Sequence, residues 1–143
     1  MSVDYYLFVS NLDSNQYYSF NTKDSFSVDL GREYILPGSW LIGLTEVSFN
    51  VNFTGDIPVP RYLNIVASVC NPQYIANEQR QILRRIPVIH GEAHVHHTFG
   101  APYYIGVSEK HFKDIQFKIL NDNWELSGLN SELSLVLHIT RNV

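Results

Sequence analysis

The sequence contains a single cysteine, Cys70, among its 143 residues. An intrachain disulfide needs two cysteines, so packing and strand pairing must stabilise the fold, and a reducing compartment is permitted. No window approaches the roughly 20 apolar residues that cross a bilayer, so we expect no membrane span. The N-terminal residues lack a basic stretch followed by an apolar core, and we expect no secretion.

Basic residues are also few. Ten Lys and Arg residues against 14 Asp and Glu residues give a formal net charge of −4. Contact with a nucleic-acid backbone normally needs a basic face. We therefore expect no direct binding of nucleic acid.

Amphipathic helices of ordinary length and catalytic motifs are missing too. The chain has no P-loop, no Gly-x-Gly-x-x-Gly, no Gly-x-Ser-x-Gly and no Cys-x-x-Cys. Aromatic residues make up 13% of the chain, which favours strands over helices. The length suits one domain, which we expect to span residues 1–143.

Strand-like patterns recur at short intervals between turn residues. The expected strands cover residues 5–10, 26–30, 40–53, 62–69, 81–88, 93–99, 103–107, 115–119 and 132–141. Such a series without helices is typical of a sandwich or barrel. The sequence therefore predicts an all-β fold, a single jelly-roll sandwich of two antiparallel sheets with about eight strands.

The longest apolar run, residues 40–53, changes phase partway along. Ile42 and Leu44 occupy even positions, whereas Val47 and Phe49 occupy odd ones. A one-residue slip moves every following side chain to the opposite face of a strand. The pattern predicts a β-bulge near Thr45, or burial on both faces.

The connecting segments have their own signals. Two prolines in residues 56–60 predict a loop or an edge, and the polar residues 71–80 predict a connection or one helical turn. Ser108 is a candidate N-cap for a helical turn over residues 108–112. The turn residues 121–123 predict a hairpin-like return between the last two strands.

Two stretches resemble the penton-type single jelly-roll minor capsid proteins of Polinton/Maverick elements and adintovirus-like DNA viruses. The first stretch is Gly38-Ser-Trp40-Leu-Ile-Gly43-Leu44-Thr-Glu46-Val47-Ser-Phe49. The second is Pro102-x-Tyr104-x-x-Val107-Ser108-x-x-x-Phe112-x-x-Ile115-x-Phe117-x-Ile119, with the closing strand Leu135-x-Leu137-His138-Ile139-x-Arg141. Together they cover about half of the chain in the family's order. The sequence departs from the family after Phe49, where Asn50-Val51 follows in place of Tyr-Pro.

This resemblance implies a structural protein, not an enzyme, without a cofactor. Five copies would form a homopentamer at each fivefold vertex of an icosahedral capsid, in contact with a double jelly-roll major capsid protein. The implied location is the capsid vertex of a virion that is assembled inside the host cell. The resemblance also implies that Trp40, Leu44 and Val47 fill the core and that Gly43 allows a close backbone approach or a bulge.

A head-to-tail contact that closes a ring needs two complementary surfaces on each copy. Basic side chains are expected to pair with acidic groups across these contacts, because every copy carries a net negative charge. The candidate subunit-interface residues are polar, charged or aromatic residues in or beside the expected strands: Arg84, Arg85, His94, His96, Tyr104 and Lys110.

The histidines provide the alternative of a metal site. His90, His94, His96 and His97 lie close together, and His94 and His96 would share one face of a strand, as in the metal-binding jelly rolls called cupins. A cupin-type set also needs a glutamate soon afterwards, and no carboxylate follows until Glu109. A structural or interface role is favoured over a metal site. The cluster could also act as a pH-dependent charge switch, but solvated histidines without such a role are favoured over it.

Two other functions remain open at this stage. Exposed tyrosines could stack on sugar rings, so a small carbohydrate- or receptor-binding β-sandwich is the main alternative, followed by a cupin-like metalloenzyme. Cys70 has no surrounding nucleophile motif and is interpreted as a small buried residue.

Overall fold

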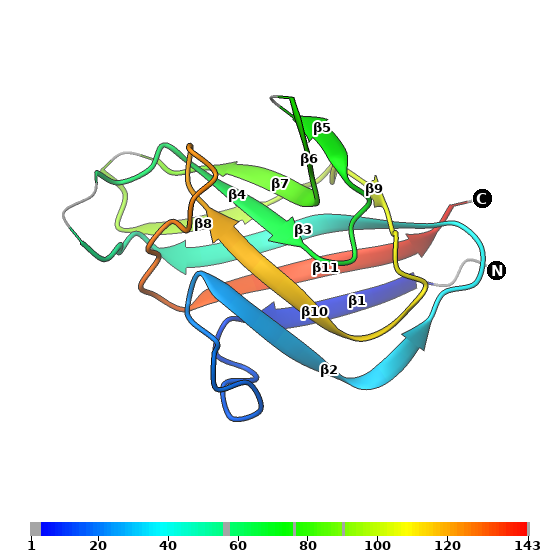
Figure 1. Ribbon diagram of the computed structural model, residues 1–143. Helices are drawn as coiled ribbons and strands as arrows, with labels where there is room; N and C mark the ends of the chain where they lie inside the picture. Colours follow the sequence, from blue (N-terminus) through cyan, green and yellow to red (C-terminus); the bar gives the residue numbers. More distant parts are fainter. Residues whose placement is uncertain (1–3, 56–57, 76, 90, 143) are drawn as a thin grey trace.

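The computed structural model describes residues 4–55, 58–75, 77–89 and 91–142, and two antiparallel sheets face each other in it (Figure 1). Sheet A contains β1 (Asp4–Ser10), β11 (Leu133–Arg141), β3 (Trp40–Asn50), β8 (His94–Thr98) and the short β9 (Ile105–Gly106). Sheet B contains β2 (Ser25–Ile35), β10 (His111–Leu120), β4 (Tyr62–Ala67) and β7 (Ile82–Pro87). A separate hairpin is made by β5 (Gln73–Ile75) and β6 (Glu78–Arg80).

The strand order is that of a jelly roll. Sheet A runs β1-β11-β3-β8, with β9 paired to β3, and sheet B runs β2-β10-β4-β7. Each sheet thus combines strands from both halves of the chain, and the first strand pairs with the last. The predicted all-β jelly-roll sandwich is confirmed. The described residues hold eleven strands instead of about eight, because β9 and the β5–β6 hairpin are added to the two layers.

The predicted bulge in the longest strand is present at Thr45. In the pairing of β3 with β11, Val136 lies opposite Glu46 and Leu137 lies opposite Leu44, so Thr45 is the extra residue. The Thr45 hydroxyl donates a hydrogen bond of 3.0 Å to the carbonyl oxygen of Val136. The bulge lets the residues before and after it bury their apolar side chains on the same face.

The core lies between the two sheets. The rings of Phe26 and Phe117 stack at 5.4 Å in its centre. Trp40, Leu44 and Val47 are buried, as the family resemblance implies. The alternation of apolar and polar residues that the sequence shows is therefore the alternation between the core and the outer surfaces.

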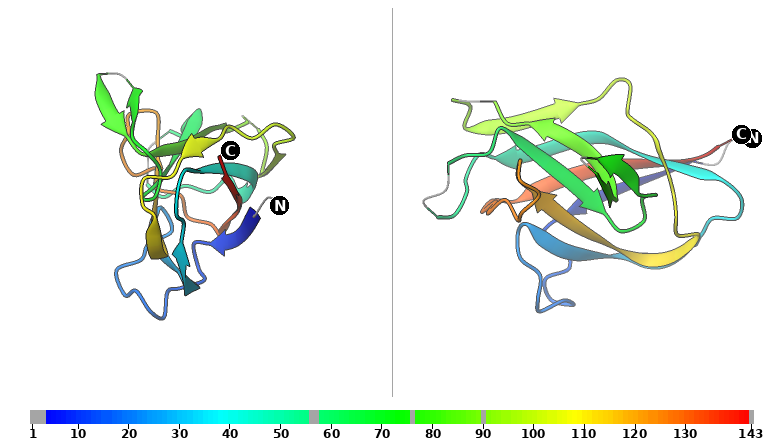
Figure 2. Two further views of the ribbon diagram at one scale, coloured as in Figure 1. Left: turned by 90° about the vertical axis from the view of Figure 1, so that its right-hand side faces the viewer. Right: turned by 45° about the horizontal axis from the view of Figure 1, so that its top comes forward.

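Three predicted connections differ from the structure in part. Residues 71–80 do connect β4 to β7, but they contain the β5–β6 hairpin, which projects from the sandwich (Figure 2), in place of the helical turn. Residues 108–112 form no helical turn, and β10 begins within them at His111. The return at residues 121–123 does reverse the chain, because Leu120 forms an antiparallel bridge with Leu126, but it does not join β10 to β11 as a hairpin, since these strands belong to different sheets.

The proline-containing segment 56–60 agrees with its prediction as far as it is described. Pro58, Val59 and Pro60 lie outside every strand, whereas Asp56 and Ile57 lie outside the described residues. Of the expected strand at 103–107, Ile105 and Gly106 pair with Ile42 and Leu41 of β3, and Val107 forms an isolated antiparallel bridge with Cys70.

Candidate functional site

The outer face of sheet A is poor in cations and carries exposed aromatic rings. Along β1, Leu7 and Val9 point into the core, so Tyr6 and Phe8 point outward with exposed fractions of 58% and 75%. Arg141 is the only lysine or arginine in the five strands of this sheet. This face is therefore partly apolar and carries little positive charge.

Two of the candidate histidines lie on this outer face and bind their neighbours on β3. His94 lies 2.7 Å from the side-chain oxygen of Asn50 through Nδ1 and 3.1 Å from the hydroxyl of Ser48 through Nε2. His96 Nε2 lies 3.1 Å from a carboxylate oxygen of Glu46. Each ring is thus held in a cross-strand pair.

The other two histidines of the cluster do not join them. His97 points the opposite way, and its ring lies 6.0 Å from that of Phe99. His90 lies outside the described residues. In the part of the chain that the structure describes, no group of three or more His, Cys, Asp and Glu side chains is arranged to hold a metal ion.

Tyr104 belongs to a second cluster on the same face, centred on His138. The Tyr104 hydroxyl lies 2.7 Å from His138 Nδ1, and Asp4 lies 3.3 Å from His138 Nε2. The Tyr6 ring stacks on the imidazole at 4.6 Å, which leaves the His138 side chain 13% exposed. Gly43 makes this packing possible, because a Cβ there would lie 3.0 Å from the Tyr104 ring.

The cluster changes the acidity of two of its members. A hydrogen bond from Thr140, with help from the charge of His138, lowers the pKa of Asp4 below its ordinary value of 3.8. Burial raises the pKa of Tyr104 above its ordinary value, and the nearby Tyr6 and Asp4 add to that effect. No pattern in the sequence pointed to Asp4 or His138 as site residues, although His138 stands in the closing strand motif, and Tyr6 is one of the tyrosines expected only as a candidate for sugar stacking.

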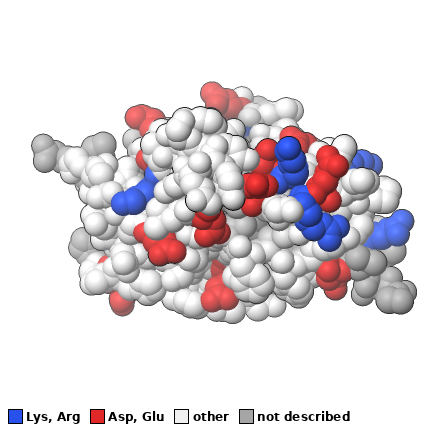
Figure 3. Space-filling view, turned by 90° about the horizontal axis from the view of Figure 1, so that it is seen from below, with Lys and Arg blue, Asp and Glu red and all other residues white. Residues whose placement is uncertain are grey.

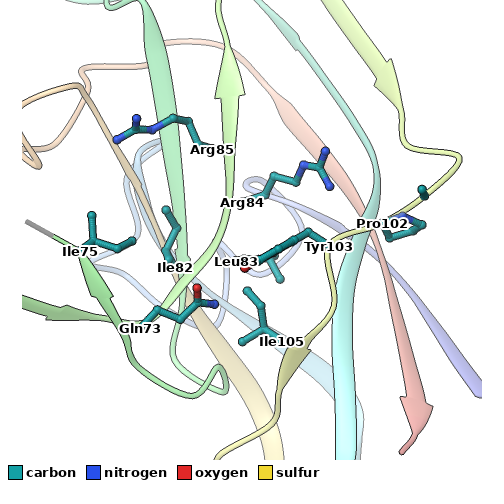
Figure 4. Close-up of a pocket in the computed structure, with 10 residues that line it drawn as sticks. Gln73, Ile75, Ile82, Leu83, Arg84, Arg85, Pro102, Tyr103 and Ile105 are labelled. Atoms are coloured by element: carbon teal, nitrogen blue, oxygen red, sulfur yellow. The ribbon is translucent and has the colours of Figure 1, made fainter.

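Arg84 and Arg85 lie on β7, the edge strand of sheet B, and leave it in different directions (Figure 4). The guanidinium of Arg84 lies 3.9 Å above the ring of Phe99. Arg85 donates a 3.0 Å hydrogen bond to Asn64 and lies 5.9 Å from the ring of Trp124. Among the described residues, neither arginine has a carboxylate within ion-pair distance.

A cavity of about 450 Å³ opens beside these arginines (Figure 4). Its wall is mainly apolar and includes the side chains of Ile75, Ile82, Leu83, Tyr103 and Ile105. The cavity exists because β7 and the residues before β9 lie at the open edge between the sheets. Its size suits one large apolar side chain or a small ligand.

The six candidate interface residues are therefore not brought together. His94, His96 and Tyr104 share the outer face of sheet A, and Arg84 and Arg85 share the β7 edge. Lys110 lies in the loop before β10, where its backbone oxygen accepts a 2.7 Å hydrogen bond from Leu36. A head-to-tail ring requires two separate surfaces, so this separation is compatible with the predicted role.

Cys70 is buried in the core, and burial raises the pKa of its thiol to about 12. A thiol with this pKa is almost fully protonated near neutral pH and is a poor nucleophile. This agrees with the interpretation of Cys70 as a small packed residue.

No family model matches the chain, and no curated protein matches its sequence. In the described part of the chain, no helix combines the length and the apolar composition needed to cross a bilayer.

Proposed function

We propose that this protein is a structural jelly-roll subunit of the penton type, a minor capsid protein that forms homopentamers at the fivefold vertices of an icosahedral capsid. In this role it contacts a double jelly-roll major capsid protein, carries out no catalysis and resides in the virion. The proposal combines the strand order of the fold with the two sequence stretches that resemble penton-type proteins.

The observation that carries the proposal is an outward-facing surface suited to protein contact. Tyr6 and Phe8 expose large aromatic rings on sheet A, and aromatic side chains are enriched at protein interfaces. The polar groups beside them, among them His96 and His138, are engaged with neighbouring side chains instead of converging on an open cleft. Such an arrangement favours binding over catalysis.

Native mass spectrometry of the purified 143-residue chain tests the proposal. We expect a species of five chains that weakens as the ionic strength rises, because charged contacts are screened by salt. Negative-stain microscopy of the same sample should show closed rings with fivefold symmetry. A predominant trimer, or a monomer that carries a tightly bound transition metal, would contradict the proposal.

A small carbohydrate- or receptor-binding sandwich is the second candidate. It draws support from Tyr103, which is exposed at the rim of the cavity beside β7, because flat aromatic rings stack on sugar faces. Binding of the chain to a glycan array, lost in a Tyr103→Ala variant with unchanged melting temperature, would favour this candidate.

A further inference from the structure

The exposed rings of Tyr6 and Phe8 belong to a surface at the β1 edge, which we name the Phe8 corner. It consists of Tyr6, Phe8, Asp13 and Asp29, which line a shallow depression where β1 and β2 meet at one edge of the sandwich. Phe8 has the highest exposed fraction of the large hydrophobic side chains in the described residues, 75%. An aromatic ring this exposed is costly in water unless a partner covers it.

The Phe8 corner is acidic. Asp13 accepts a hydrogen bond from the backbone amide of Ser10, and Asp29 accepts one from that of Gly31. Neither carboxylate has a lysine or arginine within ion-pair distance among the described residues. Seen from below (Figure 3), Asp and Glu side chains are spread across this side, while most of the visible Lys and Arg side chains gather towards the right.

The opposite edge of the sandwich has complementary properties. We use the name Arg84 edge for Arg84, Arg85 and the adjoining apolar cavity. Both arginines lack a described carboxylate partner, and Nη1 of Arg84 is shielded from solvent without a hydrogen-bond acceptor. A buried donor of this kind is stabilised by an incoming carboxylate, which forms a charge-assisted hydrogen bond.

The positions of the two surfaces suit a closed ring. A head-to-tail ring needs two separate contact surfaces on each copy. The Phe8 corner lies at the edge where β1 and β2 end the two sheets, and the Arg84 edge lies at the β7 side. The two surfaces therefore lie on different sides of the sandwich, as a ring contact requires.

We infer that the Phe8 corner of one copy docks on the Arg84 edge of a second copy of this chain. The Phe8 ring enters the cavity lined by Ile82, Leu83 and Tyr103, and Asp13 and Asp29 face Arg84 and Arg85. This inference rests on the proposed function, because it identifies the contact that closes the pentamer. A cavity of about 450 Å³ has room for a phenylalanine side chain.

Charge reversal tests the electrostatic part of the contact. Arg85→Glu and Asp29→Arg should each weaken the pentamer at least tenfold in native mass spectrometry, because each places like charges across the contact. The double variant should recover most of the loss, since it restores opposite charges in the reverse order. Lys118→Glu is the matched control, because Lys118 is exposed on β10 outside both surfaces.

Truncation of the anchor tests the apolar part. Phe8→Ala should reduce pentamer formation at least tenfold without changing the melting temperature, because the ring is exposed within one copy. Phe20→Ala is the matched control, since Phe20 is 69% exposed in a loop outside both surfaces. Equal losses in the two variants would overturn the inference.

A cysteine pair tests the geometry directly. In a Phe8→Cys, Tyr103→Cys variant, mild oxidation should give a covalent ladder that ends at five chains. Within one copy, Phe8 lies on β1 and Tyr103 lies two residues before β9, which is three places away from β1 across sheet A at about 4.8 Å per place. The two positions are therefore too far apart for the roughly 7 Å that a disulfide tolerates between Cα atoms. Cys70 stays in place, because its buried thiol does not compete.

The outcomes separate this inference from the proposed function. A pentamer that survives Phe8→Ala and Arg85→Glu, with no covalent ladder, would overturn the docking surfaces and leave the penton role intact. A chain that neither forms pentamers nor gives the ladder would overturn both. A ladder that ends at five supports both, even where the unmodified chain dissociates on dilution.

Discussion

Cys70 illustrates how burial changes the chemistry of a single side chain. It has no exposed surface, and its pKa is raised to about 12 because the thiolate would lose its hydration in the core. The residue contributes packing and a weak donor, and no reactive thiolate.

We expect Cys70 to resist alkylation at about pH 8 while the protein is folded, because the thiol is both inaccessible and protonated. Labelling with iodoacetamide, followed by mass spectrometry, should modify the single thiol in denaturant and leave it unmodified in the folded chain. Fast labelling of the native chain, at the rate of the denatured control, would contradict the described burial.

Asp4 makes a contribution to stability that depends on pH. Its pKa is lowered in the folded state, so the ionised form is stabilised by folding, above all by the hydrogen bond from Thr140. A lowered carboxyl pKa contributes stability that is present above the ordinary value of 3.8 and is lost as the pH falls through the lowered value.

Asp4→Asn should therefore lower the melting temperature at about pH 7, and the difference from the parent chain should vanish at about pH 2. The measurement is thermal unfolding followed by circular dichroism across this range. In a Thr140→Val background the effect of Asp4→Asn should shrink, since the main partner is already absent. A difference that is constant with pH would show that ionisation is not the cause.

Among the elements, β3 shows how one extra residue orients a strand. The bulge at Thr45 keeps Ile42, Leu44, Val47 and Phe49 on the core face. It also sets the outward direction of Glu46, which is how that residue reaches His96 on β8. The phase change in the sequence is thus a signal for the bulge and for the polar row beyond it.

Deletion of Thr45 should leave the chain folded. It removes only the extra residue, so Glu46 would follow Leu44 directly and still point outward, and Val47 and Phe49 would stay on the core face. The variant would lose the local twist and the Thr45 hydrogen bond, at a cost of about 1–2 kcal/mol. Thr45→Val retains the bulge and loses only the hydrogen bond to Val136, so it should cost about 1 kcal/mol in urea unfolding. A deletion variant that fails to fold would contradict this account of β3.

For the complete sandwich, the pairing of β1 with β11 joins the two ends of the described chain. This places β1 at one edge of sheet A, while β7 and β8 lie at the other side of the molecule. The Phe8 corner and the Arg84 edge are therefore products of the topology, because their residues are far apart in the sequence. A pentamer assembled through them would bury the most exposed aromatic ring of the described chain.

Most strands and the bulge could be predicted from the sequence, because alternation of apolar and polar residues is a local property. The connections at residues 71–80, 108–112 and 121–123 could not, because their conformation depends on which sheet receives the next strand. The turn residues at 121–123 illustrate the limit. They favour a reversal of chain direction, but they carry no information about which strand will pair with β10.

The alternation of apolar and polar residues along the chain was enough to predict an all-β jelly roll with a bulge in its third long strand, because a sheet with one buried face requires this alternation. The same pattern could not predict that Asp4, Tyr104 and His138 contact one another. It also could not predict that Arg84 packs on the ring of Phe99. Those contacts depend on strand order and on side-chain packing across the sheets, which link residues that no local pattern connects.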